Sequence, residues 1–197
     1  MAEPNYFKVS RTSNSSGVLT VAPTRVGQTT DYKIWCRKQG AAEWTPCVGT
    51  NVQINAGETY EFKGQNNVLY VSSSDRLAFA FSAARSTNGV FEVSGDVTTL
   101  LNETGNLLDL TGRPNCFASL FTYTDSRKQT AMKIDNLILP SMTLSEGCYK
   151  DMFVAAGANN NKFVHGDENE DGAAVSLPAQ TLATNAYLNM FYDCKVV

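Results

Sequence analysis

The 197-residue sequence contains a single histidine, His165, and none of the short motifs that mark the common enzyme classes. A Ser-His-Asp triad or a histidine-based metal cluster would therefore depend on this one residue. There is no GxSxG nucleophile elbow, no Gly-rich phosphate loop, and no HExxH or CxxC motif. His165 stands in a polar, irregular segment, which is typical of a solvated loop. We expect no enzyme activity, no catalytic residue and no cofactor.

Runs of basic residues and long apolar segments are also missing. The formal net charge is −3, and nucleic-acid binding needs clustered Lys and Arg, so we expect no DNA or RNA partner. No apolar stretch approaches the ~18 residues that span a bilayer, so we expect no membrane insertion. The N-terminal segment MAEPNYFKVS lacks the basic and apolar regions of a secretory signal. Either a leader has been removed, or the protein acts without secretion.

Cysteine is scarce and irregularly spaced. The five cysteines are Cys36, Cys47, Cys116, Cys148 and Cys194. An odd number without CxxC spacing argues against a disulfide framework and against a zinc site. Cys36 and Cys47 flank a Gly-containing turn between two strand-like segments, so a bridge and two reduced, buried thiols both stay open. We expect the other three in the core.

What the sequence does contain, in its first half, is a series of short segments rich in β-branched and aromatic residues. Hydrophobic residues make up 43% of the chain and charged residues 18%, which is typical of a folded protein. Turn residues separate the segments, and apolar positions alternate within them. Positions that share a face are Tyr32, Ile34 and Cys36 in one segment, and Leu77, Phe79 and Phe81 in another. We predict an antiparallel β-sandwich module over residues 1–95.

The second half repeats itself. LPSMTLSEGCYKDMF begins at Leu139, and LPAQTLATNAYLNMF begins at Leu177, 38 positions later (177 − 139). A more divergent copy, NCFASLF, starts at Asn115. Thr143 and Glu146 have the spacing of a helix capping box, and apolar residues follow every four positions. We therefore expect a short helix in each copy, whose apolar face is buried only when the units stack.

These patterns predict an α+β chain, with the sandwich followed by a segment of about three degenerate units with small helices over residues 96–197. The residues expected to form the core of the repeats are Leu139, Pro140, Leu144, Cys148, Tyr149, Met152, Phe153, Leu177, Pro178, Leu182, Tyr187, Met190 and Phe191.

At these residues the chain resembles the BspA-type bacterial surface leucine-rich repeats, whose units follow the pattern LPxTTLxxxCYxxMFxGC. The likeness covers about a third of the chain, and it implies a leucine-rich-repeat-like segment. The first half is similar to a β-module that precedes such repeats in proteins of gut anaerobes and their phages. Its counterparts here are Tyr32, Trp44, Ala56-Gly57, Tyr60, Lys63-Gly64, the segment FEVSG at 91–95, and Leu100-Leu101.

The chain departs from that family in three respects. Family repeats have about two dozen residues, whereas these units carry long insertions such as the segment over 155–175. Ala186 replaces the usual Cys. No polar capping unit follows the second copy, so we expect a partner, or another copy of the chain, to cover the exposed apolar end.

One acidic segment, DENEDG, has the opening spacing of a calcium loop. Asp167, Asn169 and Asp171 supply alternating oxygens, and Gly172 permits the sharp turn. The position of the closing bidentate Glu is taken by Pro178 instead. A calcium site and a solvated acidic insertion both stay open.

Two other features have alternative interpretations. Trp35 and Trp44 flank a hairpin turn, where they either belong to the core or stack on sugar rings. Asp96, Glu103 and Asp109 cluster near the predicted module boundary. A glycoside hydrolase would need two such carboxylates across a cleft, but helix caps and turns account for them.

Together these observations favour a non-enzymatic structural or interaction protein. The first hypothesis is a phage virion component, a capsid decoration or head-fibre protein that forms a homo-oligomer or binds capsid proteins. It draws on the module order, the retained Met1 and the absence of a leader. The second is a secreted bacterial surface adhesin that binds a host glycan or protein.

Overall fold

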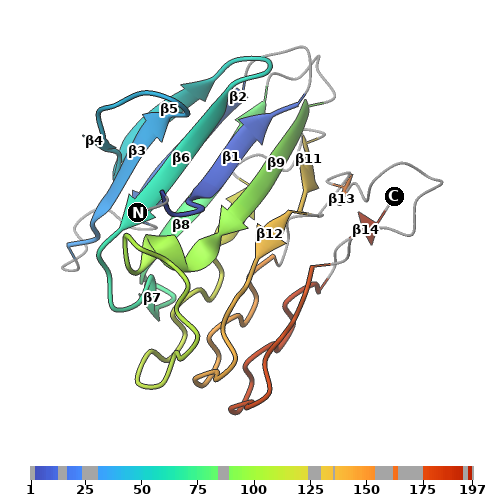
Figure 1. Ribbon diagram of the computed structural model, residues 1–197. Coiled ribbons are helices and arrows are strands. Elements are labelled where there is room, and N and C mark those ends of the chain that lie inside the picture. The colour runs from blue at the N-terminus through green and yellow to red at the C-terminus, as the bar shows by residue number, and fades with distance from the viewer. Residues whose placement is uncertain are drawn as a thin grey trace.

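The computed structural model describes residues 3–12, 17–23, 31–83, 89–123, 130–134, 136–153, 162–163, 175–192 and 195–196. Within these ranges the strands form two sheets (Figure 1). The strands of the larger sheet are β1 (Phe7–Arg11), β3 (Ile34–Lys38), β4 (Thr45–Pro46), β6 (Thr59–Gly64), β9 (Gly89–Asp96), β11 (Thr130–Lys133), β12 (Leu137–Ile138), β13 (Lys162–Phe163) and β14 (Lys195–Val196). Those of the smaller sheet are β2 (Gly17–Pro23), β5 (Thr50–Ile54), β7 (Tyr70–Ser72), β8 (Asp75–Ala83) and β10 (Phe121–Tyr123).

Strand direction changes from one half of the chain to the other. The larger sheet runs β14-β13-β11-β9-β1-β6-β3-β4, with β12 also beside β9. The strands from β1 to β9 pair antiparallel, so that Val9 lies opposite Tyr60 on one side and Val93 on the other. Beyond β9, the strands β11, β13 and β14 are added one after another in parallel. The smaller sheet runs β10-β8-β2-β5, and its last added strand, β10, is parallel to β8.

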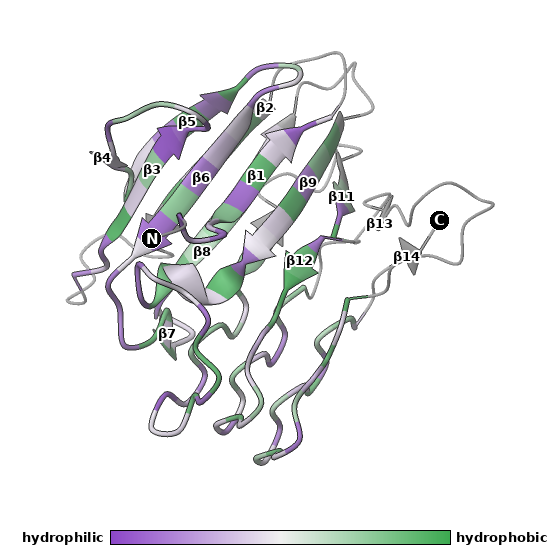
Figure 2. Cartoon of the chain, in the orientation of Figure 1, coloured by the Kyte–Doolittle hydropathy of each residue, from purple (hydrophilic) through white to green (hydrophobic). Residues whose placement is uncertain are grey.

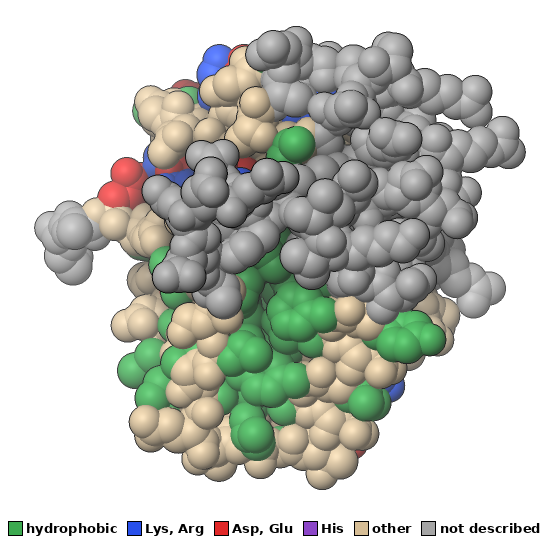
Figure 3. All heavy atoms as spheres, turned by 90° about the vertical axis from the view of Figure 1, so that its right-hand side faces the viewer, with side chains coloured by type: hydrophobic (Ala, Val, Ile, Leu, Met, Phe, Trp, Pro, Cys, Tyr) green, Lys and Arg blue, Asp and Glu red, His purple; other side chains and the backbone are tan. Residues whose placement is uncertain are grey.

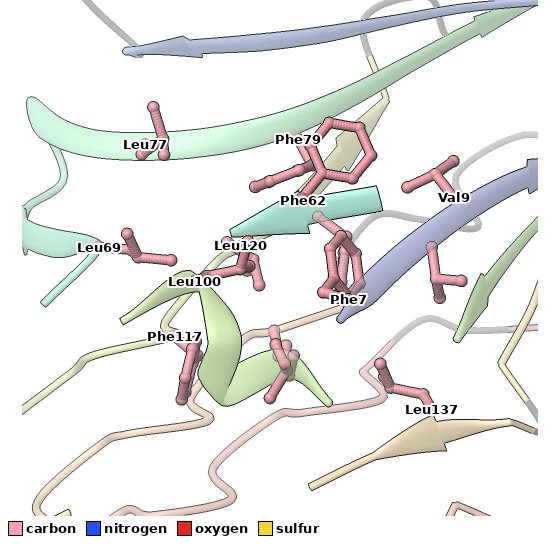
Figure 4. Packing of buried hydrophobic residues seen from close by; sticks show 14 of the residues in the cluster. Phe7, Val9, Phe62, Leu69, Leu77, Phe79, Leu100, Phe117, Leu120 and Leu137 are labelled. Carbon is pink, nitrogen blue, oxygen red and sulfur yellow. The ribbon is translucent and has the colours of Figure 1, made fainter. Parts of the chain in front are cut away.

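Aromatic side chains fill the space between the two sheets (Figure 4). The ring of Phe7 meets that of Phe79 nearly edge-on, with centroids 5.3 Å apart, and Phe62 meets Phe79 at 5.5 Å. Hydrophobic and hydrophilic positions alternate along the strands of the larger sheet (Figure 2). All six apolar members of the two predicted faces are buried, and Ala78 and Ala80 on the other face of β8 are buried as well. This two-layer, β-rich arrangement is consistent with the expected sandwich.

The repeated segments lie side by side as three long, narrow loops beyond the sheets (Figure 1). We call residues 107–121 unit 1, residues 139–153 unit 2 and residues 177–192 unit 3, and we call the three together the stack. The module boundary predicted after residue 95 falls near the end of β9. There the Gly95 N–H donates to the Asn136 carbonyl at 3.0 Å, and one hydrophobic cluster extends from the sheets into the stack.

The predicted α+β fold with small helices is wrong, because the structure is almost entirely β. In the described residues the helical structure is one short 3-10 helix, η1 (Val97–Leu100). Gly147 and Asp151 in unit 2 have φ of 59° and 53°, and Asn185 and Asn189 in unit 3 have 57° and 53°. A left-handed residue at every fourth position cannot belong to a right-handed α-helix.

Each unit is instead a series of tight turns. The N–H of Lys150 donates to the Gly147 carbonyl at 2.9 Å, and the same three-residue spacing recurs along units 2 and 3. The capping-box residue Thr143 starts no helix, because its carbonyl accepts from the Leu110 N–H of unit 1 at 3.0 Å instead of from a residue of its own unit. The apolar residues therefore recur every four positions for a reason other than helical periodicity.

No helix in the described part of the chain has the length and hydrophobicity needed to cross a membrane.

Candidate functional site at the end of the stack

Along their turns, the three units are joined by backbone hydrogen bonds of one polarity. In unit 1, the N–H groups of alternate residues from Asn115 to Phe121 donate to carbonyls of unit 2, over 2.8–3.1 Å. The N–H groups of alternate residues from Gly147 to Phe153 donate in the same way to unit 3, over 2.9–3.0 Å. Over these residues, each unit presents donors to the unit that follows it and acceptors to the unit that precedes it. At the start of the units the direction is reversed, because the N–H groups of Thr143 and Thr181 donate back to the carbonyls of Leu108 and Met142.

Two columns of aromatic rings run through the stack, parallel to its axis. Phe117, Tyr149 and Tyr187 form the first, with centroids 5.6 Å apart at both steps and interplanar angles of 5° and 9°. Phe121, Phe153 and Phe191 form the second, at 5.1 and 5.3 Å. Because burial disfavours the charged phenolate, the pKa of Tyr149 is raised well above its usual range, and that of Tyr187 is also raised.

Small and apolar side chains form the inner columns. Cys116, Cys148 and Ala186 follow one another from unit to unit, and all three are buried. Both cysteines are free thiols. Burial, above all, raises the pKa of Cys116 well above its usual range, so this thiol stays protonated and serves as core packing.

The first end of the stack is covered by the sheets. The carbonyls of Cys116 and Leu120, which would accept from a preceding unit, accept instead from the N–H groups of Leu69 and Phe79, both at 2.8 Å. The ring of Phe121 also lies 5.9 Å from that of Phe7 in β1. Unit 1 is therefore closed on this side.

The other end of the stack is exposed. Side chains of unit 3 are far more accessible than their counterparts in unit 2, although the two units have the same backbone course. The exposed fractions are 44% for Leu177 against 2% for Leu139, 63% for Leu182 against 4% for Leu144, and 42% for Phe191 against 0% for Phe153. We call the surface formed by Leu177, Leu182, Tyr187 and Phe191 the open face. Hydrophobic side chains gather on this side of the molecule (Figure 3).

The open face also carries unused backbone donors. The N–H groups of Leu182, Asn185, Tyr187 and Asn189 correspond to donors that unit 2 pairs with unit 3. Over the ranges that the structure describes, these four find no acceptor. An unpaired N–H that is withdrawn from water costs about 1–3 kcal/mol, so any partner that covers this face must supply acceptors.

The residues predicted as the repeat core do not all share one environment. Leu139, Leu144, Cys148, Tyr149, Met152, Phe153 and Met190 are buried, whereas Pro140, Pro178 and Tyr187 are half-buried. Leu177, Leu182 and Phe191 lie on the open face. Sequence reasoning missed Asn185 and Asn189, whose left-handed backbone shapes unit 3. Asn, Asp, Ser or Gly at a four-residue spacing was the signal that could have identified them.

The acidic residues near the predicted module boundary have structural partners. Asp96 accepts hydrogen bonds from the Thr98 N–H and hydroxyl at 2.8 and 2.6 Å and so caps η1. Asp109 accepts from the N–H two residues later, as expected for a turn. Glu103 pairs with Lys63 at 2.5 Å, and this lysine lowers the pKa of Glu103.

The tryptophans are half-buried and lie outside the core. The ring of Trp44 meets that of Tyr6 at 4.9 Å and lies beneath the Arg37 guanidinium at 4.5 Å. Trp35 lines a surface pocket of about 380 Å³ together with Asp31 and Tyr32. Cys36 and Cys47, near this hairpin, are both buried free thiols.

The calcium candidates Asp167, Asn169 and Asp171, as well as His165, lie outside the described residues. Among the residues that are described, no three His, Cys, Asp or Glu side chains are grouped so as to hold a metal ion. A polar pocket of about 260 Å³ opens beside the stack, with Glu146, Lys150 and Asp151 in its lining.

The family models, the curated proteins and the solved structures with which the chain was compared include no match. The resemblance to BspA-type repeats therefore stays a prediction from the residues, and the geometry of the open face is the basis for an argument about function.

Proposed function

We propose that this protein is a non-enzymatic structural protein that assembles with other protein molecules through the open face of unit 3. One observation carries the proposal. The open face repeats a surface that the chain itself buries twice, once between units 1 and 2 and once between units 2 and 3. A surface already suited to protein contact is left accessible.

The side chains of the open face can supply a substantial part of a binding energy. Complete burial of a Leu or Phe side chain contributes about 1.5–3 kcal/mol. Leu177, Leu182 and Phe191 are each more than two-fifths exposed, so a partner gains a part of that amount at each of them. Aromatic and aliphatic anchors of this kind dominate the centres of protein interfaces.

The setting that we propose is a phage virion, in which the chain serves as a capsid decoration or head-fibre protein. A β-rich body that ends in an accessible apolar face suits a part that is added to a larger assembly. The resemblance of the sequence and the order of its two halves support this setting.

The second candidate is a secreted surface adhesin that binds a host glycan. The pocket beside Trp35 favours it, because an indole ring next to Tyr32 and the carboxylate of Asp31 offers a stacking surface and a hydrogen-bond acceptor for a sugar.

The test compares Leu182→Asp with Leu108→Asp. Both leucines are at least half exposed, but Leu108 belongs to unit 1 and lies away from the open face. Gold-labelled antibody against the chain is applied to particles and cells from the culture that produces it. We expect labelled particles with the wild type and Leu108→Asp, and unlabelled particles with Leu182→Asp, because a buried carboxylate in the interface is costly.

Label on bacterial cell surfaces would favour the adhesin. Label on neither surface would contradict both settings. Equal label with Leu182→Asp and the wild type would show that the open face is not the site of assembly.

A further inference from the structure

The polarity of the hydrogen bonds restricts what can cover the open face. From Asn115 in unit 1 and from Leu144 in unit 2 onward, the N–H groups that join the units donate forward. The open face therefore presents donors at the equivalent residues of unit 3, Leu182, Asn185, Tyr187 and Asn189. The covering edge must therefore present a row of carbonyls at alternate residues. Water can satisfy these donors in the free protein, but an apolar interface excludes water.

A second copy of this chain does not meet that requirement through either end of its stack. Its first end holds the matching carbonyls, but those of Cys116 and Leu120 are already occupied by Leu69 and Phe79 of its own sheets. Its other end is an identical open face, which would bring donors against donors. Neither end of a second copy's stack therefore supplies the full row of acceptors, which favours a different chain.

The aromatic columns restrict the side chains of that partner. Tyr187 and Phe191 are the members of the two columns that belong to unit 3, and the rings of unit 2 stack on them at 5.6 and 5.3 Å. The two columns are four residues apart in every unit of the stack. A partner that continues both columns needs apolar or aromatic residues at the same spacing.

We infer that the open face binds a segment of another protein chain that continues the stack as a fourth unit. This inference rests on the proposed function and names its partner. The segment carries two aromatic or large apolar residues four positions apart, with Asn, Gly, Asp or Ser at the left-handed positions between the turns. Its carbonyls accept hydrogen bonds from the four free donors, in the manner of a strand added to the edge of a sheet.

The probe is a synthetic peptide, LPAQTLATNAYLNMF, which copies residues 177–191. The matched control peptide has Ser in place of its Tyr and Phe. Residue-resolved amide hydrogen exchange is measured on the full chain with and without each peptide. We expect the probe to slow exchange at Asn185, Tyr187 and Asn189 by about tenfold or more, and the control peptide to leave it unchanged.

Gly147, Tyr149 and Asp151 are the internal reference, because their N–H groups already donate to unit 3. Their exchange should be slow with or without peptide. The variant Leu182→Asp should lose the response to the probe, and Leu108→Asp should retain it.

Three outcomes would overturn the inference. In the first, the probe leaves the three amides of unit 3 unprotected. In the second, those amides are protected in the free protein in proportion to its concentration, which means that a second copy covers them. In the third, they exchange rapidly in the assembled protein. In the last case, if assembly still depends on Leu182, the proposed function stands while this inference fails. If assembly does not depend on Leu182, the proposed function fails as well.

Discussion

The sheets of the first half and the stack of the second half bury aromatic rings in different ways. Between the sheets, the rings of Phe7 and Phe79 cross at 82° and those of Phe62 and Phe79 at 78°. In the stack, Phe153 and Phe191 are nearly parallel, at 5°. Rings of the first kind cross at steep angles between two layers, whereas rings of the second kind stack face to face from one unit to the next.

This difference determines whether each region can bury its apolar side chains with its own residues. A pair of facing sheets closes its core with its own strands. A stack grows in one dimension, so each unit depends on its nearest neighbours and the last unit lacks one of them. The open end of the stack is therefore where a partner can add the contacts that the last unit lacks.

The largest expected effect is at the junction of the two regions. Gly95 has φ of 73°, and a Cβ added there would lie 1.9 Å from the Tyr6 carbonyl oxygen, which is backbone and cannot rotate away. We expect Gly95→Ala to remove more than ~4 kcal/mol from the free energy of unfolding, since both strain and a steric clash oppose it. Urea denaturation followed by circular dichroism measures this.

Gly57→Ala is the matched control. Its φ is 76°, but no atom lies within 4 Å of the added Cβ. We expect a loss of only about 1–2 kcal/mol, the cost of the left-handed conformation alone. Equal losses for the two variants would mean that the close approach of the Tyr6 carbonyl does not constrain Gly95.

The strands of the first half were predictable because alternating apolar and polar residues indicate one local structure, the β-strand. Residues such as Leu77, Phe79 and Phe81 share a face only in an extended chain. The existence of three stacked units was also predictable, since Tyr149 and Tyr187 occupy equivalent places in two copies of one pattern.

The conformation of the units was not predictable from their apolar residues. Leu144, Cys148 and Met152 recur every four positions, and a helix and a series of turns that each advance four residues produce the same spacing. Gly147 and Asp151 discriminate between the two, since their type and spacing suit left-handed backbone. Whether the open face presents N–H donors or carbonyl acceptors depends on which end of the stack the sheets cover. No local sequence pattern contains that information.

The second prediction compares equivalent rings within one column. Phe153 lies between Phe121 and Phe191 and is fully buried, whereas Phe191 is 42% exposed. We expect Phe153→Ala to lower the free energy of unfolding by about 3 kcal/mol, and Phe191→Ala by about 1 kcal/mol, because the terminal ring loses fewer contacts. Thermal and urea denaturation of the two variants measure the difference. Similar losses would mean that the last unit is as well covered as the middle one, which would contradict the open face.

The smallest expected effect depends on pH and belongs to the sheets. The hydrogen bond from Lys38, with further bonds from Asn55, lowers the pKa of Glu58 from the ordinary 4.5 to about 2. A carboxyl with a lowered pKa in the folded state stabilises the protein above its ordinary pKa, and the contribution is lost as the pH falls. The stability difference between the wild type and Glu58→Gln should therefore be present near neutral pH and shrink between pH 4.5 and pH 2.

This effect is small because Glu58 and Lys38 form their ion pair at the surface, where water screens it. Glu43→Gln is the control, since Glu43 is an exposed glutamate for which the described residues provide no ion pair.

The ion pairs found in the described ranges all involve a strand of the first half, at Arg37, Lys38 or Lys63. Acid should therefore weaken the sheets before the stack, and hydrogen exchange at low pH should show the amides of β3 and β6 opening while Tyr149 and Asp151 stay protected. The reverse order would mean that the surface ion pairs of the sheets do not determine which region acid weakens first.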